Sequence, residues 1–460
     1  MDTVKLKKVQ CQSSGYLYNL LCPYPFAASK NMNHVYAKVI SIDRIWREGQ
    51  RVLKESKYGI HISLMNNYMV EADYEYFTSG NQSDRPINME LIKNYKPYYY
   101  EFYAEISGKE RSHIIEATKL QWFNAELIDK DIVSDNRHII YGVVEFSASP
   151  FVEKGMALAY NADEVEAEIL KKLDDNVYTF RNSIDTCPTR YKIFENAMNE
   201  AFDYCKKVKI RVYNVGQANC VYLFSPIKKN RVLFDIGIPR EPELMSYDRK
   251  KKEVKKSLAS IKMLVPGLVI LSHWHLDHIK GAFLLNGAFN QYWIAPSIKT
   301  GIAQIPQSIK RVARYLDFNN KLLHISADKN GTLVWSNDKL RLWKGKGKSN
   351  IDNGGIILEI AGNEGTAILP GDCRYFFWPD HLNLDHNKYL VVPHHGSKLD
   401  NYCKLTKTGI CNAHAYISVG EDGRRIHKWE HPSDEHIYKL QNCGYSVETT
   451  LMKGNRDFTV

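Results

Sequence analysis

The chain has 460 residues, 44% of them hydrophobic and 12% aromatic, and it carries 62 Lys and Arg against 52 Asp and Glu, a formal net charge of +10. This composition excludes a disordered chain, a collagen-like fibre and a small disulfide-stabilised protein, and the length predicts two domains. The chain has nine cysteines without a Cys-x-x-Cys spacing, and its start does not read as a secretory signal. It also has no apolar run of the about 18 residues that a membrane-spanning helix needs. These features predict a cytoplasmic protein with no membrane partner.

Charge and histidine are distributed unevenly along the chain. Residues 1–205 hold 24 basic and 29 acidic side chains, whereas residues 206–460 hold 38 basic and 23 acidic ones. Twelve of the 16 histidines also lie in the second part, beginning at His273. A shift of this size predicts an accessory domain over 1–205 and a domain with other partners and chemistry over 206–460.

The pattern of the first 205 residues predicts a mixed α/β domain. β-branched and aromatic residues cluster over 98–106 and 138–146, which predicts strands. Residues 163–173 predict a helix with Asn161 as its N-terminal cap, and residues 191–206 predict a helix that joins the two domains. Catalytic motifs do not stand out here, so contact with a protein partner, regulation of access to the site and a second activity stay open.

From residue 209 the chain alternates short apolar strands with polar loops. The predicted strands cover 209–224 with a Gly-Gln turn, 232–237, 267–272, 354–362, 365–372, 389–395 and 415–420. Helices are predicted over 248–259, 303–316 and 432–440. Strand pairs interleaved with helices favour two sheets covered by helices.

A dense cluster of ligand-type side chains follows the apolar strand that ends at residue 271. His273, His275 and Asp277 alternate, so in an extended segment they share one face, and a helix beginning near Asp277 would bring His278 to the same cavity. Imidazole nitrogen and carboxylate oxygen are ligands for Zn²⁺, which in catalytic sites keeps one position open for water. The motif predicts a metal site.

Four further segments carry polar residues at the ends of predicted strands. Asp235 ends a strand as a buried carboxylate that could orient a ligand from behind, and Asp372 is a candidate ligand between two metals or a simple strand-end turn. Of the adjacent His394 and His395, one would ligate or donate a proton while the other packs or contacts substrate. His431 precedes Pro432, which as the first helical residue would direct His431 to the cavity, although an exposed histidine at an ordinary helix start has the same pattern.

Five segments in order, NVGQANCVYLF, LSHWHLDHIKGA, ILPGDC, VVPHHGS and SVG…HP, resemble the metallo-β-lactamase fold superfamily, and within it the soluble hydrolase domain of ComEC competence proteins. The resemblance covers about 209–455 and implies an αββα sandwich with two metal ions, His273 and His275 on one and Asp277 and His278 on the other. It implies that Asp372 bridges the ions and that His431 or one of His394 and His395 completes the shell.

The chain departs from the family pattern between His278 and Asp372. Many members carry a further histidine there, whereas this chain has only His324, which lacks the usual strand-end context. Asn353 stands nearer the expected place and is expected beside the ligands. The first metal would then be one protein ligand short, or would use His394.

The expected reaction is hydrolysis by a water between two divalent ions, with zinc favoured and manganese also suited to a His and Asp set. Asp277 would orient the water, and His394 or His395 would protonate the leaving group.

The basic segments DRKKKEVKK (248–256) and KGKGK (344–348) favour a nucleic-acid substrate held through its phosphates, with Lys250, Lys251 and Lys346 as binding residues, and therefore a nuclease or phosphodiesterase. Two alternatives stay open: hydrolysis of a small molecule such as a cyclic nucleotide, lactone or thioester, and a binding or scaffold protein on this fold.

Overall fold

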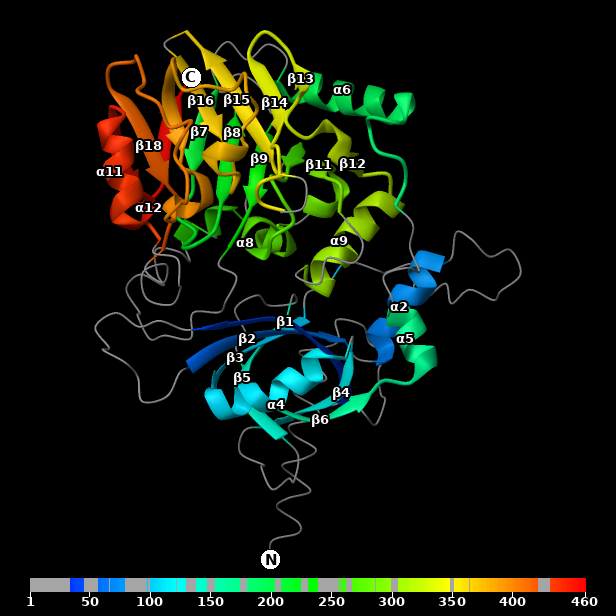
Figure 1. Ribbon diagram of the computed structural model, residues 1–460. Coiled ribbons are helices and arrows are strands. Elements are labelled where there is room, and N and C mark those ends of the chain that lie inside the picture. The colour runs from blue at the N-terminus through cyan, green and yellow to red at the C-terminus, as the bar shows by residue number, and fades with distance from the viewer. Residues whose placement is uncertain are drawn as a thin grey trace, which may run out of the picture. The chain divides into compact units, whose positions relative to one another are not determined.

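The protein is described by a computed structural model (Figure 1). The structure describes residues 34–44, 57–65, 67–78, 97, 100–120, 122–129, 138–146, 154–173, 180–202, 208–224, 231–238, 256–257, 259–261, 267–285, 287–298, 305–347, 351–363, 365–420 and 431–460. Among these residues no helix is long and apolar enough to cross a membrane.

The described chain forms two compact units. The first takes the described residues up to 180 together with 305–315, and the second takes 181–298 and 316–460. The charge shift predicted a division at residue 205, whereas the contacts divide the chain near residue 180. The difference arises because α6 (Pro188–Phe202) places Phe194, Met198 and Phe202 in the core of the second unit.

The first unit is a closed barrel with strand order β1-β2-β3-β5-β6-β4. Its strands are β1 (His34–Arg44), β2 (Lys57–Met65), β3 (Tyr100–Ser107), β4 (Phe123–Asp129), β5 (His138–Phe146) and β6 (Lys154–Glu164). The barrel closes because β1 pairs with both β2 and β4. Alternate residues such as Ile60, Ile62 and Leu64 belong to one buried core, as the two-residue period of a barrel strand requires.

Three helices of the first unit are α2 (Asn67–Thr78), α4 (Gly108–Thr118) and α5 (Ala167–Leu173). α4 begins with a capping box, in which Ser107 and Glu110 each accept a hydrogen bond from the other's backbone N–H. The helix predicted over 163–173 begins later, at Ala167, because β6 continues to Glu164 in its pairing with Phe123. Asn161 therefore lies in a strand, and its prediction as a helix cap is wrong.

The second unit contains two seven-stranded sheets, of order β12-β11-β10-β9-β8-β7-β20 and β13-β14-β15-β16-β17-β18-β19. The first sheet contains β7 (Lys209–Val212), β8 (Cys220–Phe224), β9 (Arg231–Ile236), β10 (Leu268–Ile270), β11 (Tyr292–Pro296), β12 (Leu322–Ile325) and β20 (Arg456–Thr459). The second contains β13 (Leu333–Ser336), β14 (Leu340–Lys344), β15 (Ile356–Gly362), β16 (Gly365–Leu369), β17 (Asn387–Val391), β18 (Ala413–Ile417) and β19 (Tyr445–Thr449).

The two sheets pack face to face. Phe234 and Ile270 of the first sheet share one buried cluster with Leu342 and Leu358 of the second. The alternate residues of the second sheet, among them Ile357, pack in another cluster with Leu440 of α11 (Asp434–Asn442). The first sheet is covered at β9 by α8 (Leu276–Ile279). The second unit is therefore the αββα sandwich that the sequence predicted.

Two predicted helices of this part of the chain are shifted in the structure. The helix expected over 303–316 is α9 (Gln307–Phe318). α11 begins at Asp434 instead of 432, because Ser433 is extended and its N–H donates to the carbonyl of Gly396. Pro432 is thus outside the helix, which corrects its prediction as the first helical residue. Most of the helix predicted over 248–259 lies outside the described residues.

Parallel pairing brings several strand ends to one edge of the sandwich. β9 and β10 are parallel in the first sheet, and β16, β17 and β18 are parallel in the second. Because the carboxyl ends of parallel strands lie at the same edge, the loops that follow these strands can meet there.

Candidate metal centre

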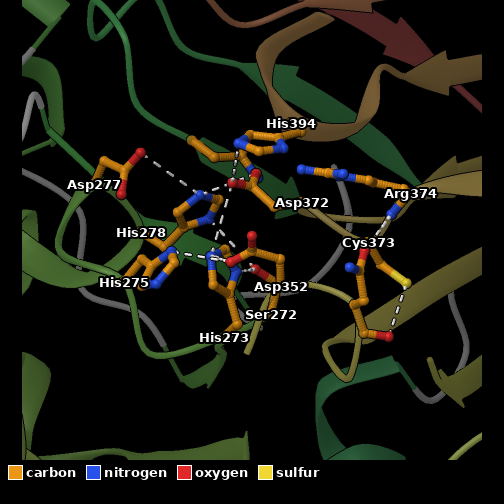
Figure 2. A network of polar contacts seen from close by, with 12 residues as sticks. Ser272, His273, His275, Asp277, His278, Asp352, Asp372, Cys373, Arg374 and His394 are labelled. Atoms are coloured by element: carbon orange, nitrogen blue, oxygen red, sulfur yellow. Dashed lines mark hydrogen bonds and ion pairs between the residues drawn. The ribbon is translucent and has the colours of Figure 1, made fainter. Parts of the chain in front are cut away.

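The HxHxDH segment starts at His273, after β10 and the two residues Leu271 and Ser272. Ser272 to His275 are non-helical, with His275 extended as the N-cap of α8 at φ −95° and ψ 154°, and Asp277 and His278 lie in the only turn of this short helix. The change from extended chain to helix gathers the ligand-type side chains of the motif in one cluster (Figure 2).

A first group of four side chains gathers around His273: His273, His275, Asp352 and Asp372. Oδ1 of Asp352 lies 3.6 Å from Nε2 of His273 and 3.1 Å from Nδ1 of His275. Oδ2 of Asp372 lies 3.8 Å from Nε2 of His273. Two imidazoles and two carboxylates thus face a common point (Figure 2).

A second group consists of Asp277, His278 and His395. Nε2 of His395 lies 3.4 Å from Oδ2 of Asp277, and Nε2 of His278 lies 4.0 Å from the same oxygen. The group combines the first turn of α8 with the loop after β17, so it joins the two sheets of the sandwich.

Asp372 lies between the two groups and turns one oxygen to each. Its Oδ1 is 3.2 Å from Nε2 of His278 and 3.8 Å from Nε2 of His395, whereas its Oδ2 is 3.8 Å from Nε2 of both His273 and His394. A carboxylate in this position is suited to bridge two cations.

The spacing and burial of these atoms fit divalent ions. Nε2 of His273, His278 and His395 is buried without a hydrogen-bond partner among the described residues. Atoms that bind a tetrahedral ion at roughly 2 Å lie about 3.3 Å from one another, which is close to the separations within both groups. Unused nitrogens at ligand-to-ligand spacing, facing carboxylates, are the donor set that zinc or manganese accepts.

Asp235 holds His278 from behind. This fully buried carboxylate lies 2.7 Å from Nδ1 of His278 and accepts hydrogen bonds from the N–H of Ser272 at 2.6 Å, its hydroxyl at 2.8 Å and the Asn219 amide at 2.8 Å. With Nδ1 donating to a carboxylate, Nε2 of His278 keeps its lone pair for a metal.

The backbone approaches closely at Gly371, beside Asp372. Gly371 has φ +56°, and a Cβ atom there would lie 2.4 Å from Oγ of Ser272. Only glycine fits both the left-handed conformation and this contact. The loop after β16 can therefore bring Asp372 against the loop after β10.

The adjacent His394 and His395 both reach Asp372. In an extended segment their side chains would point apart, but both residues have left-handed backbone, at φ 51° and 52°. Nδ1 of His395 lies 2.9 Å from the carbonyl of Ser418 and must donate to it, so its Nε2 is left as the ligand atom. His394 lies at the margin of the first group, with 19% of its side chain exposed.

Electrostatics keep the carboxylates of the centre ionised. Burial alone would raise the pKa values of Asp277, Asp352 and Asp372, but the facing histidines outweigh it and hold all three pKa values below the usual carboxyl range. Burial would lower the pKa of His278, but Asp372 and Asp235 raise it well above its usual value.

The histidines next to the carboxylates differ from one another. Burial lowers the pKa of His273 to about 3, and the neighbouring His278 acts in the same direction. Burial also lowers the pKa of His394. Burial would also lower the pKa of His275, but Asp352 outweighs it and the pKa is raised. The pKa of His395 is raised in the same way, because Asp372 outweighs burial.

Other predicted residues lie outside the two groups. His431 is buried, with its ring centroid 5.6 Å from that of His394 and 6.2 Å from that of His395. The Asn353 amide oxygen accepts the backbone N–H of Arg374 at 3.3 Å. Lys346 pairs with Asp380. Lys250 and Lys251 lie outside the described residues.

Asp352 is the residue of the centre that the sequence analysis missed. It lies in the turn before β15 and belongs to the first ligand group with His273, His275 and Asp372. The sequence pattern favours the neighbouring Asn353, which stands near the expected position. A carboxylate is the better cation ligand, so the donor chemistry of Asp352 was the available signal.

Comparison with known proteins gave no matching family model and no matching curated protein. Among solved structures, the chain is similar to the metallo-β-lactamase fold protein YhfI from Bacillus subtilis, at 14% identity over 55% of this chain and 100% of that one, with a TM-score of 0.31. It is also similar to unliganded yeast PDE1, at 11% identity over 54% and 99%, with a TM-score of 0.33. Zn²⁺-bound PqqB from Methylobacterium extorquens is 8% identical over 55% and 99%, with a TM-score of 0.30.

With helices on its outer faces and a His- and Asp-rich centre at the strand ends, the two-sheet sandwich of the second unit has the metallo-β-lactamase type of fold.

Proposed function

We propose that the second unit is a metal-dependent hydrolase with a dinuclear centre. His273, His275 and Asp352 would hold one ion, Asp277, His278 and His395 the other, and Asp372 would bridge them. The observation that carries this proposal is the position of Asp372, whose two oxygens face different ligand groups. A single ion would use only one of these groups.

Two divalent ions would supply hydroxide at neutral pH and stabilise charge on the attacking and leaving oxygens. Asp277, with 21% of its side chain exposed, can accept a hydrogen bond from the attacking water and orient it. Both nitrogens of His395 are directed inward, to Ser418 and to the carboxylates. We therefore assign proton donation to the leaving group to the more exposed His394.

The substrate that fits best is a phosphodiester of nucleic acid. Three carboxylates and a bound hydroxide would balance the charge of two divalent cations, so the centre alone does not select an anion. The excess of basic residues over 206–460 is what favours a polyanion. Hydrolysis of a small phosphodiester, lactone or thioester is the alternative, and it predicts that neither DNA nor RNA is cleaved.

The test combines metal analysis with hydrolysis of single- and double-stranded DNA and RNA in the presence of Zn²⁺ or Mn²⁺. Protein purified without chelator is expected to hold about two ions per chain and to cleave at least one of these polymers. The Asp277→Ala, Asp372→Ala double variant is expected to lose both properties. Asp338→Ala, which changes an exposed carboxylate in the turn between β13 and β14, is the matched control and is expected to retain them. Fewer than one ion per chain in the unaltered protein would contradict the proposal.

A further inference from the structure

Arg374 lies beside the proposed metal centre and has no part in the ligand groups. It follows Asp372 by two residues and precedes the short 3-10 turn Tyr375–Phe377. Its backbone N–H donates to the amide oxygen of Asn353 at 3.3 Å, and Asn353 is the neighbour of Asp352. The backbone of Arg374 is thus tied to the loops that carry Asp352 and Asp372.

The side chain of Arg374 extends towards His394 and Asp372 (Figure 2). Only 22% of it is exposed, and its Nε is buried without a hydrogen-bond partner among the described residues. Its recorded ion pair, from Nη1 to Oδ2 of Asp400, spans 3.6 Å and ends on a carboxylate that is 97% exposed. Such a pair contributes little, because water and salt screen it.

Two other cations on this side of the sandwich are already used within the protein. Lys346 pairs with Asp380. Lys404 donates to the carbonyls of Trp378 and Pro379, at 2.9 Å and 2.6 Å, and also pairs with Asp380. Arg374 differs because its guanidinium is directed to the centre and its buried donor is unused.

A mostly buried guanidinium whose recorded ion pair ends on an exposed carboxylate is costly unless another anion compensates it. The planar fork of arginine presents parallel N–H donors that match two oxygens of a phosphoryl group. A neutral carboxylic ester or amide offers a single uncharged oxygen and could not satisfy this fork.

We propose that Arg374 binds non-bridging oxygens of a phosphoryl group in the substrate, and so makes the centre selective for anionic phosphorus esters over neutral carboxylic esters. This inference rests on the proposed hydrolase function and names the residue that distinguishes the substrate class.

The test compares two substrates that share a leaving group and differ in charge, bis(p-nitrophenyl) phosphate and p-nitrophenyl acetate. Arg374→Gln is expected to lower kcat/KM for the phosphodiester by roughly 30-fold, the effect of losing a hydrogen bond to a charged group. For the acetate the loss is expected to stay below about threefold, because no anion is bound. Metal content is measured alongside and is expected to be unchanged.

Titration of inorganic phosphate into the metal-loaded protein, followed by calorimetry, gives a readout independent of hydrolysis. Arg374→Gln is expected to raise the Kd for phosphate at least about tenfold, and Arg374→Lys less, because charge is kept and the fork is lost. Asp400→Asn, the matched control, removes the exposed partner and is expected to leave phosphate binding unchanged.

An unchanged phosphate Kd in Arg374→Gln, or an equal loss of kcat/KM for both substrates, would overturn the assignment of Arg374. Absence of hydrolysis of DNA, RNA and both small substrates by the metal-loaded, unaltered protein would instead contradict the proposed function, and the phosphate titration would still decide the role of Arg374.

Discussion

At the scale of single residues, the metal centre depends on which of two neighbouring side chains supplies a ligand. Asp352 directs Oδ1 to His273 and His275, whereas Asn353 uses its amide oxygen to accept a backbone N–H. We therefore assign Asp352 to metal binding and Asn353 to holding the loop in place.

Substitution of Asp352 and of Asn353 is expected to affect metal binding differently. Asp352→Ala is expected to lower the metal content from about two ions to about one per chain, because the first group loses a carboxylate and the second is intact. Asn353→Ala, the adjacent control, is expected to keep about two. Metal analysis of both variants after the same dialysis tests this difference. Equal metal content in the two variants would show that Asp352 is not a metal ligand.

A buried histidine outside the centre couples stability to pH. His436 is fully buried, with Nδ1 2.9 Å from the carbonyl of Ser397 and Nε2 3.0 Å from the Tyr375 hydroxyl. Burial lowers the pKa of His436 to about 4, against 6.5 for the free side chain. The unfolded chain therefore binds this proton at a higher pH than the folded one, and stability is lost as the pH falls from about 6.5 to about 4.

Between pH 7 and pH 5 this one group is expected to remove about 2 kcal/mol from the free energy of unfolding. Urea unfolding at the two pH values, for the unaltered protein and for His436→Gln, isolates the effect, since other titrating groups are common to both. If both proteins lost the same amount of stability, His436 would not be the group responsible.

At the scale of elements, the sequence allowed most of the second unit to be predicted because its signals are local. The HxHxDH motif follows β10 closely, and alternation along short strands specified the two sheets. Asp352 could not be found in this way, because it lies between β14 and β15 of the other sheet, far along the chain from His273 and His275. The helix start at Pro432 was predicted wrongly, since Pro432 precedes the helix instead of opening it, and the role of His431 as a ligand stays a prediction.

Gly371 tests whether the loop after β16 needs its tight contact. Gly371→Ala is expected to destabilise the protein by about 2–4 kcal/mol, because the left-handed backbone penalty adds to a clash with Ser272. Gly287→Ala is the matched control: Gly287 has φ +80°, but nothing lies within 4 Å of its Cβ position, so about 1 kcal/mol is expected. Urea unfolding compares the two variants. Similar losses of stability would show that the close contact at Gly371 does not add to the cost of the substitution.

At the scale of the whole molecule, the basic character of residues 206–460 should govern how a polymer substrate binds. Each phosphate that a protein neutralises releases counterions, so affinity for nucleic acid falls steeply with salt. The protein partner suggested for residues 1–205 stays a prediction, and the binding roles of Lys250 and Lys251 do as well.

The KM for a DNA or RNA substrate is expected to rise about tenfold between about 50 and 200 mM salt, which corresponds to roughly two released counterions. Over the same range the KM for bis(p-nitrophenyl) phosphate is expected to change less than about threefold, because it carries one charge. Equal salt dependence for the polymer and the small diester would contradict a nucleic-acid substrate and favour a small one.

The central claim is that Asp372 joins two ions a few ångströms apart. Electron paramagnetic resonance of protein loaded with Mn²⁺ tests it most directly, because two ions about 3.5–4 Å apart couple magnetically and an isolated ion does not. The account predicts a coupled pair in the unaltered protein, with about two Mn²⁺ per chain, and loss of the coupling in Asp372→Ala. A spectrum of isolated Mn²⁺ in the fully loaded, unaltered protein would contradict the account.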